Sequence, residues 1–188
     1  MYKEGFVSIK GVFVITIKPA QSIDQNAIAQ LHATSWQAVY AGLLDEQYLS
    51  KGVFSERGTI WQHRFSQPSA NQRIFVASEQ KKLLGFICIY LDQSDAQGTL
   101  IENLHVDTGT KGKGVGKALL QHAARVIQAE ASHNGAYLEV LSQNVSAQRF
   151  YDYFGGNPVL SQQWQAPEGS LVDELVYQWE QIATILER

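Results

Sequence analysis

The arrangement of apolar, polar and glycine residues is most informative between positions 100 and 128. Leu100–Val106 is a short, largely apolar run with the length of a buried strand. Asp107–Thr110 consists of turn-forming residues that end this run. Lys111–Lys117 then interleaves lysine with glycine and continues directly into Ala118, where a helical pattern begins. The pattern therefore predicts a strand, a glycine-rich bend and a helix.

The rest of the chain mixes the strand and helix periods, with no internal repeat and no linker. The pattern predicts further strands over 12–17, 73–77, 83–91, 136–141, 159–163 and 171–179, and helices beginning near 22, 45, 55 and 145. A chain of 188 residues with this pattern is most simply one α+β domain around one core.

The glycine-rich bend has the properties of an anion-binding site. Glycine lets the backbone approach a ligand, and the unpaired amides and dipole at a helix N-terminus favour negative charge. Lys111, Lys113 and Lys117 add positive charge where phosphate oxygens would lie. A Walker loop is excluded, because Lys111 and Ala118 stand where it needs glycine and a hydroxyl residue. The dinucleotide fingerprint also fails, since the glycines read G-x-G-x-G.

The bend resembles the acetyl-CoA loop of the GCN5-related N-acetyltransferases (GNAT), Q/R-x-x-G-x-G/A. Lys111 stands at the Arg or Gln position, and Gly114 and Gly116 match both glycines. Thr108 replaces a proline that many members have. A second block resembles the family's L-E-V strand followed by N-x-x-A-x-x-F-Y, with its members at Glu139, Asn144, Ala147, Phe150 and Tyr151. The two motifs cover about residues 98–157, and the pattern extends more loosely over most of the chain.

This resemblance implies the GNAT fold, of α+β (three-layer α/β/α) type. Its mixed central sheet has about seven strands, carries helices on both faces and is splayed at the acetyl-CoA site. Acetyl-CoA would be the acetyl donor, and no metal is implied. Backbone groups of Leu104 and Val106, together with Asn144, would pair with the pantetheine arm. The cofactor-binding residues that the resemblance implies are Leu104, His105, Val106, Lys111, Gly112, Lys113, Gly114, Val115, Gly116, Lys117, Asn144, Ala147 and Tyr151.

Residues 14–188 are expected to form the N-acetyltransferase domain, and residues 1–13 an N-terminal extension. In the family the first strand lies near the N-terminus and is followed by Pro-Ala, as Pro19-Ala20 is here. The extension is either a native additional strand or the product of an upstream start codon. The sequence leaves both explanations open.

Acetyl transfer to an amine requires a base more than an acid. A primary amine with a pKa of about 10.4 needs roughly 4–5 kcal/mol to become neutral at pH 7, whereas protonating a thiolate with a pKa of about 8.5 gains only about 2 kcal/mol. Glu102 and Glu139 are the candidate bases, since glutamates at these positions occur in some polyamine and ribosomal-protein acetyltransferases of the family, respectively. Glu102 ranks first because the acetyl carbonyl should lie against its strand. Strand alternation places His105 on the opposite face from Glu102, which makes it a weaker candidate.

Two further roles follow from the resemblance. Tyr151 would lie near the cofactor sulfur and donate a proton to the thiolate. Trp36 and Tyr40, with Glu102, would bind the acceptor, although aromatic residues at helical spacing are equally typical of a core. The implied function is N-acetylation of a primary amine on a small molecule, such as a polyamine, amino acid or aminoglycoside, by direct attack in a ternary complex. Alternatives are an N-terminal or lysine acetyltransferase of proteins and a non-catalytic acyl-CoA-binding module.

Composition bears on possible partners, on the cellular compartment and on the oligomeric state. A net charge of −3 gives no reason to expect nucleic acid, and one cysteine excludes an internal disulfide and suits a reducing compartment. No apolar run approaches the roughly 18 residues that span a membrane, so a cytoplasmic protein is expected. The apolar strand with Val172, Leu175, Val176, Tyr177 and Trp179 either supports a homodimer or closes the monomer's own sheet.

Overall fold

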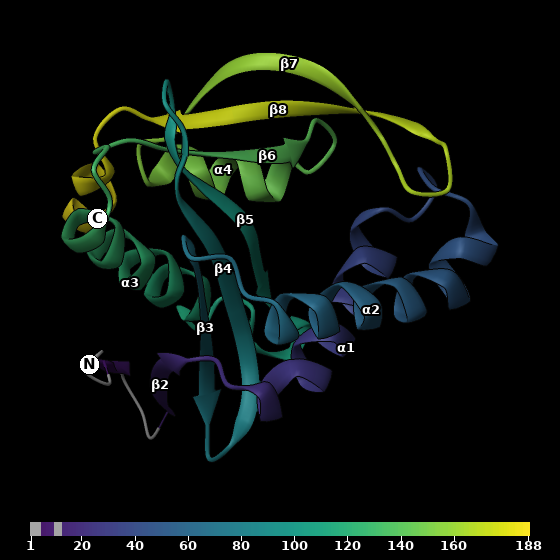
Figure 1. Cartoon of the computed structure of the whole chain (residues 1–188), viewed down its shortest axis with the longest axis horizontal. Coiled ribbons are helices and arrows are strands. Elements are labelled where there is room, and N and C mark those ends of the chain that lie inside the picture. The colour runs from purple at the N-terminus through teal and green to yellow at the C-terminus, as the bar shows by residue number, and fades with distance from the viewer. Residues whose placement is uncertain (1–4, 10–12) are drawn as a thin grey trace.

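The computed structural model describes residues 5–9 and 13–188. The chain forms a mixed sheet with helices on both faces (Figure 1). The elements are β1 (Gly5–Ile9), β2 (Phe13–Pro19), α1 (Gln25–Val39), α2 (Val53–Ser66), β3 (Gln72–Glu79), β4 (Lys82–Ser94), β5 (Gly98–Val106), α3 (Val115–Glu130), β6 (Ala136–Leu141), α4 (Val145–Tyr153), β7 (Asn157–Gln165) and β8 (Leu171–Trp179).

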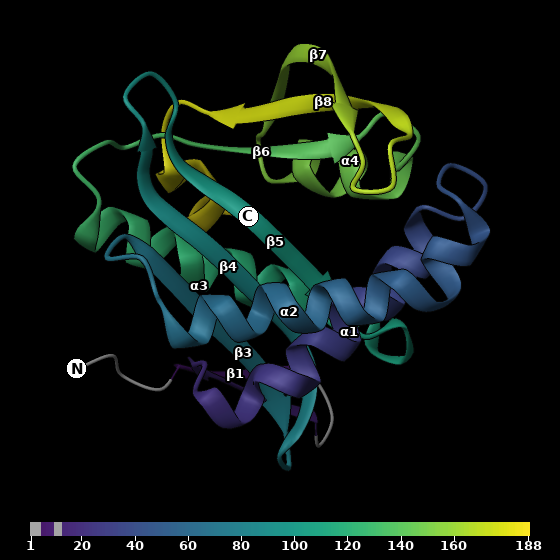
Figure 2. The same cartoon turned by 45° about the vertical axis from the view of Figure 1, so that its right-hand side comes forward.

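The strand order is β1-β2-β3-β4-β5-β6-β8-β7, with β5 and β6 as the parallel pair. Helices α1 and α2 cover one face of the sheet, and α3 and α4 pack on the other (Figures 1 and 2). The expected α+β architecture, a mixed sheet with helices on both faces, is thereby confirmed, with β1 added at one edge of the predicted sheet.

The central strand β4 shows why its sequence is almost continuously apolar. Phe86 and Cys88 point to the side where α1 and α2 pack, whereas Ile87 and Ile89 belong to the core beneath α3. A strand buried on both faces has no polar side to present, so its period-two signal disappears. The single thiol, Cys88, is buried in this core, and burial raises its pKa to about 12. A packed thiol of this kind is inert.

The strands β5 and β6 pair at only two positions before they part. Thr99 lies beside Ala136 and Leu100 beside Tyr137, and no further pair follows among the described residues. Figure 2 shows the two strands diverging from this shared end. Each strand remains paired on its other side, β5 with β4 and β6 with β8. The sheet is therefore splayed between β5 and β6, as expected.

A β-bulge in β5 corrects the expected direction of His105. Cys88 pairs with Asn103 and Ile89 with Ile101, so Glu102 is the additional residue on β5. The bulge interrupts the alternation on which the opposite orientation rested. Glu102 contacts Arg64 of α2, and His105 contacts Ser35 of α1, so both lie on the face covered by these helices.

The two ends of the chain bear on other expectations. Within the predicted extension, residues 5–9 form β1, antiparallel to β2, while 1–4 and 10–12 lie outside the described residues. The apolar residues of β8 point to the monomer's own core, since Val172, Val176, Tyr177 and Trp179 are all buried there. A homodimer stays a prediction, but these four side chains offer it no surface.

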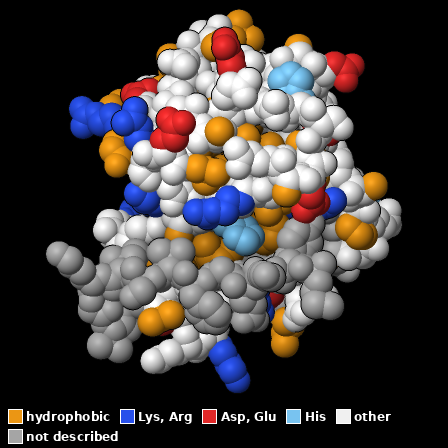
Figure 3. Space-filling model, turned by 90° about the vertical axis from the view of Figure 1, so that its left-hand side faces the viewer, with side chains coloured by type: hydrophobic (Ala, Val, Ile, Leu, Met, Phe, Trp, Pro, Cys, Tyr) orange, Lys and Arg blue, Asp and Glu red, His pale blue; other side chains and the backbone are white. Residues whose placement is uncertain are grey.

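Three further observations concern the surface and the helices. On the face shown in Figure 3, where α3 and the C-terminus lie, basic and acidic side chains are interspersed with small hydrophobic areas. No helix within the described residues is long and apolar enough to cross a membrane. The short helix expected near residue 45 is a π-helix at Tyr48–Gly52 that continues into α2.

The β5–β6 junction generates a stability prediction at Gly98. Its φ is +85°, and an added Cβ would lie 2.3 Å from the carbonyl oxygen of Gly135. Left-handed strain and this backbone clash together should destabilise Gly98→Ala by about 3 kcal/mol or more. Gly42→Ala is the matched control, because its φ is +77° but nothing lies within 4 Å. Urea unfolding should give about 1 kcal/mol for the control; equal losses would contradict the packing argument.

Candidate active site

A cavity of about 730 Å³ lies where β5 and β6 part. It extends from the N-terminus of α3 to aromatic side chains of α1 and β7. Its lining contains the predicted bases Glu102 and Glu139, together with Tyr151, Trp36 and Tyr40. Of the predicted cofactor residues, Lys113 is the one outside the lining; those within it are Leu104, His105, Val106, Lys111, Gly112, Gly114, Val115, Gly116, Lys117, Asn144, Ala147 and Tyr151.

One end of the cavity is an anion cradle at the start of α3. Gly114 precedes the helix in a left-handed conformation, with φ 81°, and no side chain caps the first turn. The amides of Val115, Gly116 and Lys117 therefore have no helical acceptor. These free amides, the helix dipole and the side chains of Lys111 and Lys117 together form a site that suits the negatively charged pyrophosphate of coenzyme A.

Facing strand edges form the middle of the cavity. Residues 102–106 of β5 and 138–141 of β6 line it, and their backbone groups on these edges are not paired with each other. Asn144 caps α4, because its Oδ1 accepts from the Ala147 amide at 3.1 Å. Its Nδ2 is the donor that remains for a ligand. Tyr151 is mostly buried beside this segment, and burial raises its pKa above the usual value of 10.

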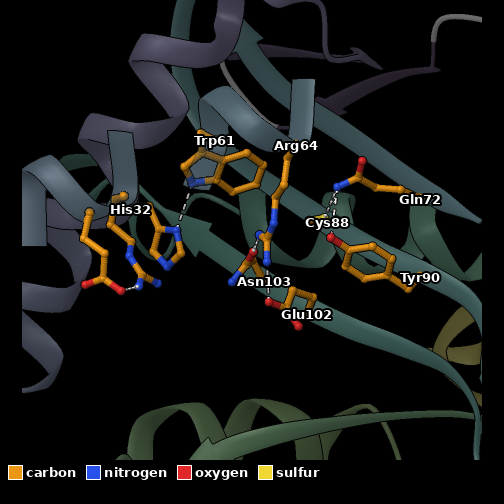
Figure 4. A network of polar contacts seen from close by, with 10 residues as sticks. His32, Trp61, Arg64, Gln72, Cys88, Tyr90, Glu102 and Asn103 are labelled. Atoms are coloured by element: carbon orange, nitrogen blue, oxygen red, sulfur yellow. Dashed lines mark hydrogen bonds and ion pairs between the residues drawn. The ribbon is translucent and has the colours of Figure 1, made fainter. Parts of the chain in front are cut away.

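The bulged end of β5 is held from α2 by Arg64 (Figure 4). The guanidinium donates to Glu102 Oε1 at 2.5 Å and to Asn103 Oδ1 at 2.7 Å, and it lies over the Trp61 ring. The carboxylate of Glu102 is therefore already engaged in an ion pair. Removing its charge would also leave Arg64 without its ionic partner, although the hydrogen bond to Asn103 would remain.

Two histidines lie behind the bulge as neutral rings. Burial lowers the pKa of His105 to about 4, and its Nδ1 lies 2.8 Å from Ser35 Oγ. His32 stacks near it, with ring centroids 4.5 Å apart, and accepts from Trp61 Nε1 (Figure 4). Burial likewise lowers the pKa of His32. At neutral pH neither ring carries a charge, and His105, which lines the cavity, adds only polarity to its wall.

Aromatic rings enclose the far end of the cavity. Trp36 of α1 packs against Tyr40 at 4.5 Å and against Trp164 of β7 at 5.8 Å between ring centroids. The guanidinium of Arg57 lies 4.0 Å from the centre of the Trp36 ring and donates to Glu56 Oε1 at 2.6 Å. Trp36 and Tyr40 therefore pack in an apolar cluster and also line the cavity, and their contact with an acceptor stays a prediction.

Two carboxylates lie on the same face of β6 and β8 at this end. Glu139 accepts from Gln162 Nε2 at 3.1 Å. Glu174 is 6% exposed, lines the cavity and has a buried Oε2 with no hydrogen-bond partner. Burial, and secondarily the charge of Glu139, raise the pKa of Glu174 to about 7. The far end of the cavity is thus acidic where the α3 end is basic.

A family model described as the acetyltransferase (GNAT) family matches residues 29–155. The chain belongs to this family. The expected resemblance to this family is confirmed. The match begins within α1 and includes the bulge, the cradle and Tyr151, but ends before β7 and β8.

Individual GNAT relatives are distant. The 5-NmdU N-acetyltransferase of Pseudomonas phage PaMx11 is 34% identical over 93 residues, which span 48% of this chain and 63% of that relative's length. A GCN5-related N-acetyltransferase of Rhodopseudomonas palustris superposes with a TM-score of 0.67 at 15% identity, covering 86% of this chain and 92% of that one. The PaiA N-acetyltransferase of Thermoplasma acidophilum, in complex with coenzyme A, gives 0.62 at 19% identity, covering 85% and 97%. The two structures share the fold.

Sequence reasoning missed several residues of this GNAT site. Arg57 and Trp164 reach the cavity through contacts between α1, α2 and β7, which no local motif encodes. Glu174 did leave a signal, because it falls between Val172 and Val176 on the inward positions of β8. A carboxylate in an apolar row is an exception that points to a function. Among the described residues, no group of three or more His, Cys, Asp and Glu side chains is placed to hold a metal ion.

The buried carboxylate generates a prediction about stability and pH. The folded-state pKa of Glu174 lies above its usual 4.5, so its ionisation opposes folding, and stability is lost as pH rises from 4.5 through about 7. Glu174→Gln removes this ionisation. Its stability relative to wild type should increase by up to about 3 kcal/mol between pH 4.5 and pH 8, measured by urea unfolding. Asp173→Asn, on the exposed side of β8, should show no such increase; a pH-independent difference for Glu174→Gln would contradict this prediction.

Proposed function

We propose that this protein is an N-acetyltransferase that transfers the acetyl group of acetyl-CoA to the primary amine of a small molecule. The observation that carries the proposal is one continuous cavity with an anion cradle at one end and an acidic, aromatic end at the other. Acetyl-CoA supplies an activated acyl group as a thioester. Direct transfer requires both substrates at once, and this cavity has a separate end for each.

Enclosure of the acceptor end favours a small molecule over a protein. Trp164 of β7 contacts both Trp36 and Tyr40 of α1, so side chains close the space between the helices and the β7–β8 hairpin. The backbone amide of Asp45 also donates to Glu168 of this hairpin, at 3.4 Å. A peptide passing through the site would need an open groove here, as extended ligands do.

Glu102 and Glu139 remain candidates for contact with the acceptor. Both line the cavity, but Glu102 is bound to Arg64 and Glu139 accepts from Gln162. The ion pair makes Glu102 better suited to fixing the bulge and the edge of β5 than to taking up a proton. Glu139 lies on the acidic side, where a cationic acceptor would be attracted.

Tyr151 is suited to donate a hydrogen bond. Because burial raises its pKa above 10, the phenol stays protonated at neutral pH. An ordinary thiolate, with a pKa of about 8.5, is too weak a base to take that proton completely. A donated hydrogen bond would still stabilise negative charge on sulfur.

The proposal is tested by thiol release from acetyl-CoA with an amine panel of spermidine, L-lysine, phenethylamine, kanamycin and an amino-terminal peptide. We expect release with small amines and none with the peptide. Preferential acetylation of the peptide would replace a small acceptor by a protein. Coenzyme A binding without release from any amine would instead support the non-catalytic module. A reducing compartment such as the cytoplasm, where the sole thiol Cys88 would stay reduced, remains the expected place of action.

The cradle generates a prediction at Gly114. A side chain on this left-handed residue would strain the backbone and enter the place of the pyrophosphate. Gly114→Val should weaken acetyl-CoA binding by at least about 100-fold, or roughly 3 kcal/mol, in calorimetric titration. Gly169→Val is the control, because Gly169 also has a positive φ (106°) but lies outside the cavity lining. Unchanged affinity in Gly114→Val would contradict the cradle.

Tyr151→Phe separates a hydrogen bond from a proton transfer. Loss of one donated hydrogen bond to a developing charge should lower kcat by about 10- to 100-fold. The loss should be the same from pH 6 to 9, because the phenol does not ionise in this range. Tyr177→Phe is the control: its hydroxyl donates to Asp152 at 3.0 Å, outside the cavity, and its loss should leave kcat unchanged. A loss confined to one side of this range would assign Tyr151 a titrating role.

A further inference from the structure

Glu174 is a buried carboxylate at the wall of the acceptor end without a positive partner. Its Oε2 has no hydrogen bond, and no ion pair of the described residues reaches it. It comes from β8, outside the residues that the family model matches. An isolated buried carboxylate is unfavourable unless a cation or a proton neutralises it. Its presence at a cavity wall therefore points to a cationic ligand.

The elements around Glu174 can be named from the strand register. Leu141 of β6 and Gln162 of β7 are its direct neighbours, and Glu139 lies diagonally across on the same face. Gln162 is neutral; it donates to Glu139, and a side-chain hydrogen bond from it to Glu174 offsets part of the rise in the pKa of that carboxyl. The neighbours of Glu174 on these strands are therefore an amide (Gln162), an apolar side chain (Leu141) and a second carboxylate (Glu139).

The helices opposite add two titratable groups. Tyr40, which follows the last residue of α1, interacts electrostatically with Glu174, and burial raises the pKa of Tyr40, so the phenol is neutral. Arg57 of α2 also lines the cavity, but Glu56 compensates its charge and the Trp36 ring covers one face of its guanidinium. The two carboxylates thus lack a compensating charge from these helices. An ammonium group entering here would find two carboxylates and the faces of aromatic rings, all of which attract cations.

We propose that Glu174 accepts the proton that the acceptor's ammonium group must lose before it can be acetylated. The inference rests on the proposed function and adds a catalytic residue to it. In this step an N–H bond of the ammonium breaks, its electron pair stays on nitrogen, and the proton forms an O–H bond on the Glu174 carboxylate. The proton then leaves to solvent through the mouth of the cavity. The neutral amine is left with the lone pair that acyl transfer requires.

The acidity of Glu174 matches this task. With a pKa of about 7, it is partly ionised at neutral pH and holds a proton far better than an ordinary carboxylate. A general base works best when its pKa is near the working pH. Glu102, by contrast, is exposed and engaged with Arg64. Its position at the bulge suits Glu102 to holding the shape of β5. Glu174 on the opposite wall is then the carboxylate that accepts the proton.

The test is the pH dependence of kcat/KM for wild type and variants between pH 5.5 and 9.5, with phenethylamine and spermidine as probe amines. Wild type should show an acidic limb near pH 7. Glu174→Gln should lower kcat/KM at pH 7 by about 100- to 1,000-fold. Most of this loss should be recovered as the pH approaches the pKa of the free amine. Glu174→Asp, which keeps a carboxylate, should retain a limb near neutrality with an intermediate rate.

Glu139→Gln distinguishes a titrating base from a merely structural residue. Removing the neighbouring negative charge should lower the pKa of Glu174 and move the acidic limb to lower pH. Asp173→Asn is the matched control on the same strand: it is exposed, bonded to Gln163 and outside the cavity, and should leave the profile unchanged. A limb that stays in place in both Glu174→Gln and Glu139→Gln would overturn the inference.

Infrared difference spectroscopy supplies a readout that needs no acceptor. The protein alone should show a protonated carboxyl band that titrates near pH 7, disappears in Glu174→Gln and titrates lower in Glu139→Gln. If Glu174→Gln raises KM without changing kcat or the limb, the residue only anchors the ammonium and the inference is wrong. Absence of thiol release by wild type with every amine would contradict the proposed function itself. Wild-type release with an unaltered profile in Glu174→Gln would overturn this inference alone.

Discussion

The parting of β5 and β6 after two paired residues is the constraint on which the site depends. Beyond Leu100 and Tyr137, each strand keeps one satisfied edge and turns the other toward the cavity. Backbone amides and carbonyls left in this way need partners, because an unpaired buried polar group is costly. Water can supply them in the free protein, and an extended polar chain such as pantetheine can replace it. Gly98 and Gly135 are in close contact at the end that the two strands share.

A second feature of the site is a buried negative charge in a fold that gains nothing from it. Ionised Glu174 opposes folding, and the aromatic residues around it could pack equally well against an apolar side chain. Structures retain such groups where chemistry requires them, at the expense of stability. At the β5 bulge the carboxylate does have a partner, because Arg64 donates hydrogen bonds to both Glu102 and Asn103. The carboxylate on the β5 wall of the cavity is thus paired with a cation, whereas Glu174 on the β8 wall has no cationic partner.

Local motifs made the fold and the cofactor end predictable from the sequence. The cradle lies in seven consecutive residues, Lys111–Lys117, and Asn144 and Tyr151 lie on one short segment, so the resemblance to GNAT motifs could single them out as candidates. The acceptor end is assembled from α1, α2, β6, β7 and β8, and its contacts depend on strand register and helix packing. The predicted orientation of His105 was wrong for the same reason, because the bulge at Glu102 arises only from the pairing of β5 with β4. No pattern within β5 reveals it.

The opposite charges at the two ends of the cavity give the site a direction. The N-terminus of α3 and the lysines at 111 and 117 attract phosphate and repel an ammonium group. Glu139 and Glu174 attract the ammonium and repel phosphate, and the aromatic rings between α1 and β7 exclude part of the water that would screen them. Under the proposed function, each substrate would therefore be guided to its own end before either contacts the other. Because the proposed base belongs to the acceptor's wall, an amine would become nucleophilic only after it has reached the place where an acyl group can be presented to it.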